Sequence, residues 1–127
     1  MKFTIEGRLP SLNEYVNSCR TNRFAAAKMK KDCEELITHY IKNSVIETYK
    51  EPVTICFSWY EKNTRRDKDN IAFGKKFILD ALQKTGVLEN DNWHCVTGFK
   101  DEFFVDKEHP RIEVEISLII PFLDIDE

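Results

Sequence analysis

Apolar and polar residues alternate in several short stretches of the chain, and this pattern predicts a sheet. Residues 2–6 and 111–118 alternate regularly, and residues 53–60 are rich in β-branched and aromatic side chains. A shorter apolar stretch, residues 93–99, predicts a fourth strand. The last two strands are expected to form a hairpin, and its charged loop, residues 100–110, is expected either to be mobile or to meet a partner.

Two longer stretches repeat apolar residues with helical spacing. The first covers residues 22–45, and the second begins at Asp69 or Asn70 and ends before Gly86, a plausible residue just past a helix C-terminus. Residues 7–17 contain Pro, Ser and Asn and are expected to form an ordered loop. These elements predict an α+β fold in the order β-α-β-α-β-β, with a mixed four-stranded sheet and two helices on one face.

The size and composition are those of one soluble domain. The 127 residues suffice for a single core. No apolar run reaches the roughly 18 residues of a membrane helix, and the N-terminus lacks the apolar segment of a secretory signal, so a cytoplasmic protein without membrane contact is expected. The four cysteines form no Cys-x-x-Cys pair, which gives no support to a zinc site. Cys33 and Cys56 fall at apolar positions and are expected to be small core residues.

Charge is distributed unevenly along the chain. Residues 1–100 hold 17 Lys or Arg against 13 Asp or Glu, a net of +4, whereas residues 101–127 hold 2 against 9, a net of −7. We expect residues 1–120 to form the domain and residues 121–127 to be a frayed acidic tail. The basic residues cluster, and a local basic patch suits phosphate binding even when the whole chain is acidic. For any single cluster, a solvated face is the better explanation.

Acidic residues flank the second predicted helix. Asp67 and Asp69 precede it, and Glu89 and Asp91 follow it. The helix would bring both flanking segments to one sheet edge if the following loop folded back. In an extended segment residues i and i+2 point the same way, so Asp67 and Asp69 would face one cation, and Asp91 would complete the site. Mg²⁺ prefers such oxygen ligands and needs few of them when substrate phosphate contributes.

Two lysines and an aspartate follow inside the same predicted helix. Lys75 or Lys76 would reach the scissile phosphate or the leaving oxygen of a nuclease reaction. Asp80 is four residues from both Lys76 and Lys84, so ion pairing on the helix surface explains it adequately.

Alternative explanations of the acidic motif stay open. Asp69 is a good N-cap residue, and Asp67 is then a solvated turn residue. An EF-hand is excluded, because Ala72 and Ile78 occupy the positions where that loop needs Gly and Glu.

Several segments together resemble the RusA family of Holliday-junction resolvases. They are Leu9-Pro-Ser-Leu-Asn-Glu-Tyr15, Arg65-Arg-Asp-Lys-Asp-Asn70, Asp80-Ala-Leu, Gly86-Val-Leu and the acidic position Asp91. The resemblance covers most of residues 3–118. It implies a homodimeric endonuclease of the phage or prophage type that uses Mg²⁺, with Mn²⁺ as an alternative metal, and no small-molecule cofactor. Its activity would be the resolution of four-way junctions by paired symmetric nicks in recombination and repair.

The resemblance also implies roles for individual residues. Asp67, Asp69 and Asp91 match the metal-binding catalytic acids of the family, and Lys76 matches the catalytic lysine placed beside them. The DNA-binding surface would comprise Asn13, Arg20, Arg23, Lys28, Lys30, Lys31, Arg65, Arg66 and Lys75.

Two departures from the family pattern leave questions open. Asn90 stands where the family often has a second aspartate, which lowers the acidity around the metal. The helical segment before Asp80 is about one turn longer than the family form, so the lysine assignment stays open between Lys75 and Lys76. A non-catalytic protein that binds junctions or other branched DNA is therefore the alternative, and a plain structural domain with a capped helix is the third hypothesis.

Overall fold

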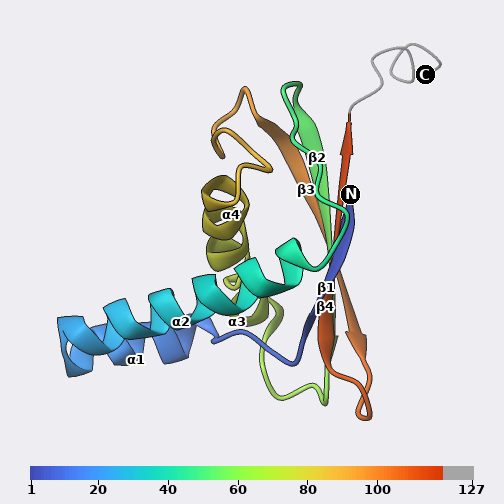
Figure 1. Ribbon diagram of the computed structural model, residues 1–127. Coiled ribbons are helices and arrows are strands. Elements are labelled where there is room, and N and C mark those ends of the chain that lie inside the picture. The colour runs from blue at the N-terminus through green and yellow to red at the C-terminus, as the bar shows by residue number, and fades with distance from the viewer. Residues whose placement is uncertain (119–127) are drawn as a thin grey trace.

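Figure 1 shows the computed structural model of the chain, which describes residues 1–118. Four strands form one mixed sheet in the order β1-β4-β2-β3: β1 (Lys2–Glu6), β2 (Val53–Glu61), β3 (Val96–Val105) and β4 (Arg111–Leu118). The strand β4 runs antiparallel to β1 and β2, whereas β2 and β3 are parallel. The predicted α+β class with a mixed four-stranded sheet is confirmed.

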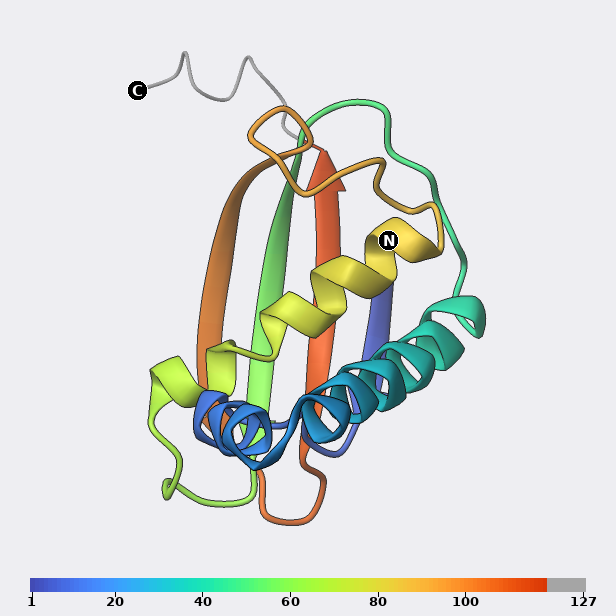
Figure 2. The ribbon, with the colours of Figure 1, turned by 90° about the vertical axis from the view of Figure 1, so that its left-hand side faces the viewer.

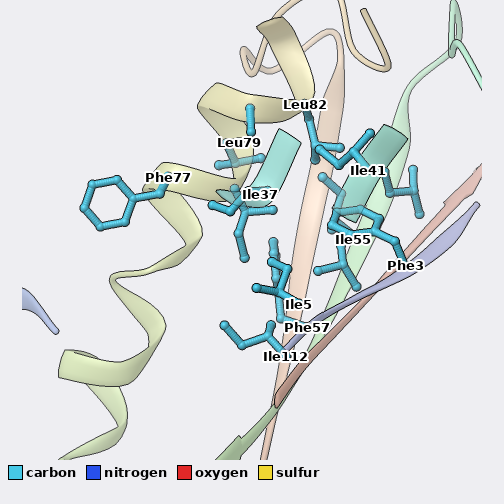
Figure 3. Packing of buried hydrophobic residues seen from close by; sticks show 14 of the residues in the cluster. Phe3, Ile5, Ile37, Ile41, Ile55, Phe57, Phe77, Leu79, Leu82 and Ile112 are labelled. Atoms are coloured by element: carbon cyan, nitrogen blue, oxygen red, sulfur yellow. The ribbon is translucent and has the colours of Figure 1, made fainter. Parts of the chain in front are cut away.

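The helices lie on one face of this sheet (Figure 2): α1 (Leu12–Thr21), α2 (Arg23–Lys42), α3 (Lys68–Ala72) and α4 (Lys75–Lys84). Every second residue of β2 is buried beneath them, because side chains alternate between the two faces of a strand. Ile37 and Ile41 of α2 and Leu82 of α4 pack over Ile55 and Phe57 of β2 (Figure 3). No helix within residues 1–118 is long and apolar enough to cross a membrane.

The segment expected to be an ordered loop, residues 7–17, contains the start of α1, so that prediction was wrong. Ser11 caps the helix: its hydroxyl accepts from the Glu14 N–H at 3.2 Å, and the Glu14 carboxylate accepts from the Ser11 N–H at 3.4 Å. This capping box needs Ser and Glu three residues apart, which the sequence shows. The sequence also carries helical apolar spacing here, at Leu12, Tyr15, Val16 and Cys19, but the loop-forming residues Pro10, Ser11 and Asn13 outweighed it in the prediction.

The second predicted helix is two helices. Lys68–Ala72 and Lys75–Lys84 are separated at Phe73–Gly74, where the chain passes close to the N-terminal segment. A side chain at Gly74 would begin 3.2 Å from the Leu9 side chain, so only glycine fits there without displacing Leu9. Gly86 has φ +81°, in the left-handed region, as expected for the residue that ends the helix.

The strand expected at 93–99 extends instead from Val96 to Val105, so most of the expected 100–110 loop is wrong. Alternation explains the extension, because Asp101 points toward the helices while Lys100 and Glu102 lie on the uncovered face of an edge strand. Asp101 accepts from the Trp59 indole at 2.9 Å. The expected hairpin is also wrong, since β2 lies between β3 and β4. The expected tail, 121–127, lies outside the described residues.

The core assignment of the cysteines holds for one of the two residues. Cys33 is buried, and burial raises the pKa of its thiol to about 11. Cys56 is only half-buried, because it lies on the face of β2 that carries no helix. All four cysteines are free thiols.

Candidate metal and DNA site

Asp67 and Asp69 lie where the chain leaves β2 and enters α3. Asp67 has the extended backbone of an N-cap residue but makes no capping hydrogen bond, and Asp69 is in the first helical turn. The two are therefore not in one extended segment, although both line the same cavity of about 470 Å³ with Phe103, Phe104 and other residues at the end of β3. Within residues 1–118 neither carboxylate forms an ion pair, and the Asp69 carboxylate accepts only from the N–H of Asn70. Two carboxylates free of cations thus face one cavity.

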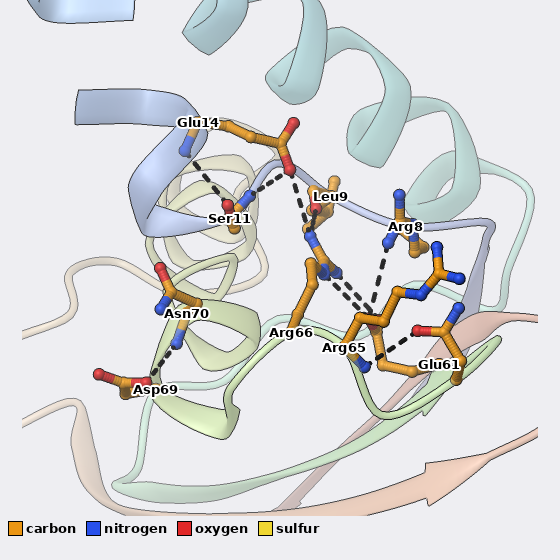
Figure 4. Close-up of polar contacts among 10 residues, drawn as sticks. Arg8, Leu9, Ser11, Glu14, Glu61, Arg65, Arg66, Asp69 and Asn70 are labelled. Carbon is orange, nitrogen blue, oxygen red and sulfur yellow. Dashed lines mark hydrogen bonds and ion pairs between the residues drawn. The ribbon is translucent and has the colours of Figure 1, made fainter. Parts of the chain in front are cut away.

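A buried ion-pair network holds this loop in place (Figure 4). The Arg66 guanidinium donates to both carboxylate oxygens of Glu61 at 2.9 Å and to the carbonyl of Leu9 at 2.9 Å. Glu61 ends β2 at an inward position and is only 6% exposed, so its charge requires this partner. The Asn70 side chain accepts from the Asn13 N–H at 3.0 Å, which joins α1 to α3. The motif is therefore fixed from both sides.

The network includes one arginine that was expected to bind DNA and one residue that the sequence reasoning missed. Arg66 was expected to bind DNA, but its guanidinium is already committed to Glu61, whereas no ion pair within residues 1–118 involves Arg65. Glu61 was missed because it was assigned to a charged turn. The signal was its register, since it continues the inward series of β2 and a charge at an inward position needs a partner nearby.

Asp91 lies at the opposite end of the sheet from Asp67 and Asp69. It precedes β3, whose first residue, Val96, pairs with Val53 at the start of β2. Asp67 follows the other end of β2, at Glu61, which lies eight residues after Val53 or about 26 Å along the strand. The expectation that the helix returns both acidic segments to one edge is therefore not met within a single chain. Among residues 1–118, no group of three acidic, His or Cys side chains could hold a metal ion.

The two candidate lysines have different surroundings. The Lys75 ammonium donates to Asp101 at 2.7 Å and lies 4.7 Å from the centre of the Phe99 ring, so it joins α4 to β3. Lys76 is 58% exposed, and its ammonium is 3.3 Å from Asp80. The helix-surface pair expected for Asp80 is confirmed with Lys76 but not with Lys84, which pairs with Glu34. Of these two lysines, Lys76 has the more exposed side chain.

The remaining expected DNA contacts gather on one projection. Arg20 ends α1, and the other four lie in the first half of α2: Arg23, Lys28, Lys30 and Lys31. Figure 1 shows both helices extending away from the sheet together. Lys28 pairs with Asp32 at 2.7 Å, which raises the pKa of Lys28, and Lys30 approaches Asp80 at 3.9 Å. The five basic residues therefore share one pair of helices, although Lys28 and Lys30 have different neighbours.

The donor set at Asp67 and Asp69 fits a hard divalent cation but supplies only part of a site. Carboxylate oxygens are the ligands that Mg²⁺ prefers, and Mg²⁺ keeps several waters when protein ligands are few. A second group of oxygen ligands, from substrate phosphate or from another chain, would complete the coordination.

Comparison with known proteins agrees with these features. The family model of the endodeoxyribonuclease RusA matches residues 7–117. No match was found among curated proteins. The matched region spans the α1 segment, the acidic motif and Asp91. Nucleases of this family are generally metal-dependent and take branched DNA as substrate. The chain therefore belongs to the RusA family of endodeoxyribonucleases, the enzymes that resolve Holliday junctions.

Proposed function

We propose that this endonuclease works as a homodimer whose Mg²⁺ sites each combine Asp67 and Asp69 of one chain with Asp91 of the other. Mn²⁺ is an alternative ion with the same preference for oxygen. The observation that supports this most is the parallel pairing of β2 with β3, which separates Asp91 from the other two acids by the length of a strand.

The exposed edge of the sheet offers a surface where two chains would meet. The strand β3 is an edge strand, so one row of its backbone groups is free to pair with another chain. Exposed apolar side chains accompany this edge, among them Phe99, Phe104 and Val105, and Trp93 is 95% exposed just before the strand. Such a set is typical of an interface.

A two-fold axis at this edge would bring Asp91 of one chain close to Asp67 and Asp69 of the other. Two β3 strands related by such an axis run antiparallel, so the start of one strand lies beside the end of the other. Asp91, near the start of β3, would then approach the partner's cavity, which is lined by Asp67, Asp69 and the end of β3. Each dimer would hold two equivalent sites. A four-way junction is itself nearly two-fold symmetric, which suits paired nicks.

The residues of the chain would act on the phosphodiester in distinct ways. Asp67, Asp69 and Asp91 would hold the ion, which when bound polarises a phosphate and lowers the pKa of a water. Lys76 would contact the scissile phosphate or the departing oxygen through its exposed ammonium. The Glu61–Arg66 pair would keep the loop rigid, so that the two acids on it stay in place.

Subunit complementation tests this proposal directly. Asp69→Asn and Asp91→Asn are purified separately, mixed under conditions of subunit exchange, and assayed on a synthetic four-way junction with Mg²⁺. Each variant alone should be inactive. If the site is shared, the mixed dimer keeps one intact site and makes single nicks, because both substitutions fall in the other site. If each site lay within one chain, the mixture would stay inactive.

A matched mixture is the control. Asp67→Asn and Asp69→Asn alter the same half of the site, so their mixed dimer should show no recovered cleavage. Linear duplex of the same sequence serves as the substrate control, and cutting it as fast as the junction would indicate a general nuclease.

The alternative is a protein that binds branched DNA without cutting it. It is favoured by the absence of three convergent acids within residues 1–118 and by Asn90 at the position before Asp91. Such a protein would shift a junction in a gel with EDTA present and leave it intact at every Mg²⁺ and Mn²⁺ concentration.

A further inference from the structure

The first two helices form a projection that contributes little to the core. We call residues 12–32, which comprise α1 and the first half of α2, the basic arm. The helix α1 buries no residue, and the buried residues of α2 are Cys33, Ile37 and Ile41, all beyond the arm. Figure 1 shows the arm extending past α4, away from the sheet. Among residues 1–118, the arm packs on the core only through the partly buried Tyr15 and Met29, near its base, so core packing does not explain its far end.

The charge of the arm suits a polyanion. It carries five basic residues, Arg20, Arg23, Lys28, Lys30 and Lys31, against two acidic ones, Glu14 and Asp32. The chain as a whole has a net charge of −3, so this excess is local. DNA phosphates are the complementary surface in the substrate of this family.

An aromatic ring stands at the far end of the arm. Phe24 is 72% exposed, although aromatic side chains gain most from burial. The Arg23 guanidinium lies 5.2 Å from the centre of its ring, so the exposed ring and a positive charge are side by side. A charge that would hold a phosphate is thus next to a surface that would stack on a base.

The corner that presents Phe24 is stiff. Asn22 ends α1 with its N–H donating to the Ser18 carbonyl at 3.2 Å, and it begins α2 with its side chain accepting from the Ala25 N–H at 2.7 Å. One residue therefore caps both helices, with an extended backbone that turns the chain sharply. The Phe24 ring is held on a rigid support instead of a flexible loop.

We infer that Phe24 is a wedge that stacks on bases at the branch point of the junction, while the basic arm holds the flanking phosphates. This inference rests on the proposed function, because it takes a four-way junction as the substrate. In linear duplex both faces of each internal base pair are covered by its neighbours. At a branch point the terminal pairs expose a face to an apolar ring, and such wedges are common in proteins that distort DNA.

The experiment uses full-length protein and junctions carrying 2-aminopurine beside the branch point, with Ca²⁺ in place of Mg²⁺ to prevent cutting. This base becomes brighter when it loses its stacked neighbours. Wild type should raise its fluorescence. Phe24→Ala should lose most of this rise and bind the junction about tenfold more weakly, as loss of one base–aromatic contact predicts. Phe24→Trp should restore both, and the affinity of Phe24→Ala for linear duplex should be unchanged.

Val45→Ala is the matched control, since Val45 is equally apolar and exposed but lies beyond the other end of α2. It should behave as wild type. If Phe24→Ala bound the junction and raised the fluorescence as wild type does, Phe24 would not act as a wedge. The proposed function, which concerns the junction as substrate, would be unaffected. If wild type itself did not bind the junction more tightly than duplex, the proposed substrate would be wrong. The inference about Phe24 would then be wrong as well, because it depends on that substrate.

Discussion

The two ends of the β2–β3 pair are built differently, although the RusA family match covers both. At the end that carries Asp67 and Asp69, a cavity is lined by three elements and the loop is fixed by Glu61 and Arg66. At the end that carries Asp91, the residues before β3 are exposed, and the Asp91 N–H is bound only by its neighbour Asn90. The first end is organised within one chain, whereas the second is exposed, as expected of a surface that meets another molecule.

Removing a carboxylate at the organised end should have the largest effect. Asp69→Asn keeps the size of the side chain and removes the charge that would hold the ion, so we expect junction cleavage to fall at least about 100-fold. The folded state should be unaffected, because the Asp69 carboxylate makes no ion pair within residues 1–118. Single-turnover cleavage and a gel shift in Ca²⁺ measure the two effects separately. Cleavage at the wild-type rate would remove Asp69 from the site.

The neighbouring arginines give a sharp test of what fixes the organised end. Arg66→Ala leaves Glu61 buried without its main partner, and we expect it to destabilise the fold by about 3 kcal/mol. Arg65→Ala should change the free energy of unfolding by less than about 0.5 kcal/mol, because Arg65 has no such buried partner. Urea unfolding followed by circular dichroism measures both. Equal effects would mean that the Glu61–Arg66 pair does not hold the loop.

The exposed edge of the sheet can be tested without altering either acidic group. Val105 is the last residue of β3 and is more than half exposed. Val105→Asp places a negative charge where two chains would meet, and we expect self-association to weaken roughly tenfold and cleavage to fall with it. Sedimentation over a range of concentrations gives the dissociation constant. The matched control is Val45→Asp, on an exposed residue outside the sheet. Unchanged self-association in Val105→Asp would exclude this edge as the interface.

The smallest effect on stability is expected at the open end. Trp93→Ala removes a large ring that is almost fully exposed, so the free energy of unfolding should change by less than about 0.5 kcal/mol. If the residues before β3 meet a second chain, the same variant should nevertheless dissociate more readily, since an aromatic residue at an interface contributes more than its surroundings. Loss of stability at a concentration where the protein is monomeric would show that Trp93 packs within its own chain.

The sequence predicts those parts of the fold that rest on local patterns. Alternation correctly gave β1, β2 and β4, and Gly86 correctly marked the end of α4. The prediction failed for α1, because Pro10, Ser11 and Asn13 are typical of a loop and outweighed both the Ser11–Glu14 capping box and the apolar spacing that follows it. The extended β3 was missed because charged residues on an edge strand resemble those of a loop.

The arrangement of the candidate site needed the structure for a different reason. The sequence places Asp67, Asp69 and Asp91 around one helical segment, but it does not say whether β3 runs parallel or antiparallel to β2. That choice decides whether Asp91 returns to the same edge. Similarly, the proximity of Arg66 to Glu61 depends on how a five-residue turn closes, which spacing alone does not fix.

The strand order also has a consequence for how the protein is made. Among residues 1–118, the first strand, β1, pairs only with β4, and β4 also fills the place between β1 and β2. A chain emerging from the ribosome therefore lacks the centre of its sheet until residues 111–118 have been synthesised. Until then β1 has no strand to pair with. Contacts between such distant segments slow folding and leave strand edges exposed meanwhile. We therefore expect truncation before Arg111 to give aggregation instead of a smaller folded domain.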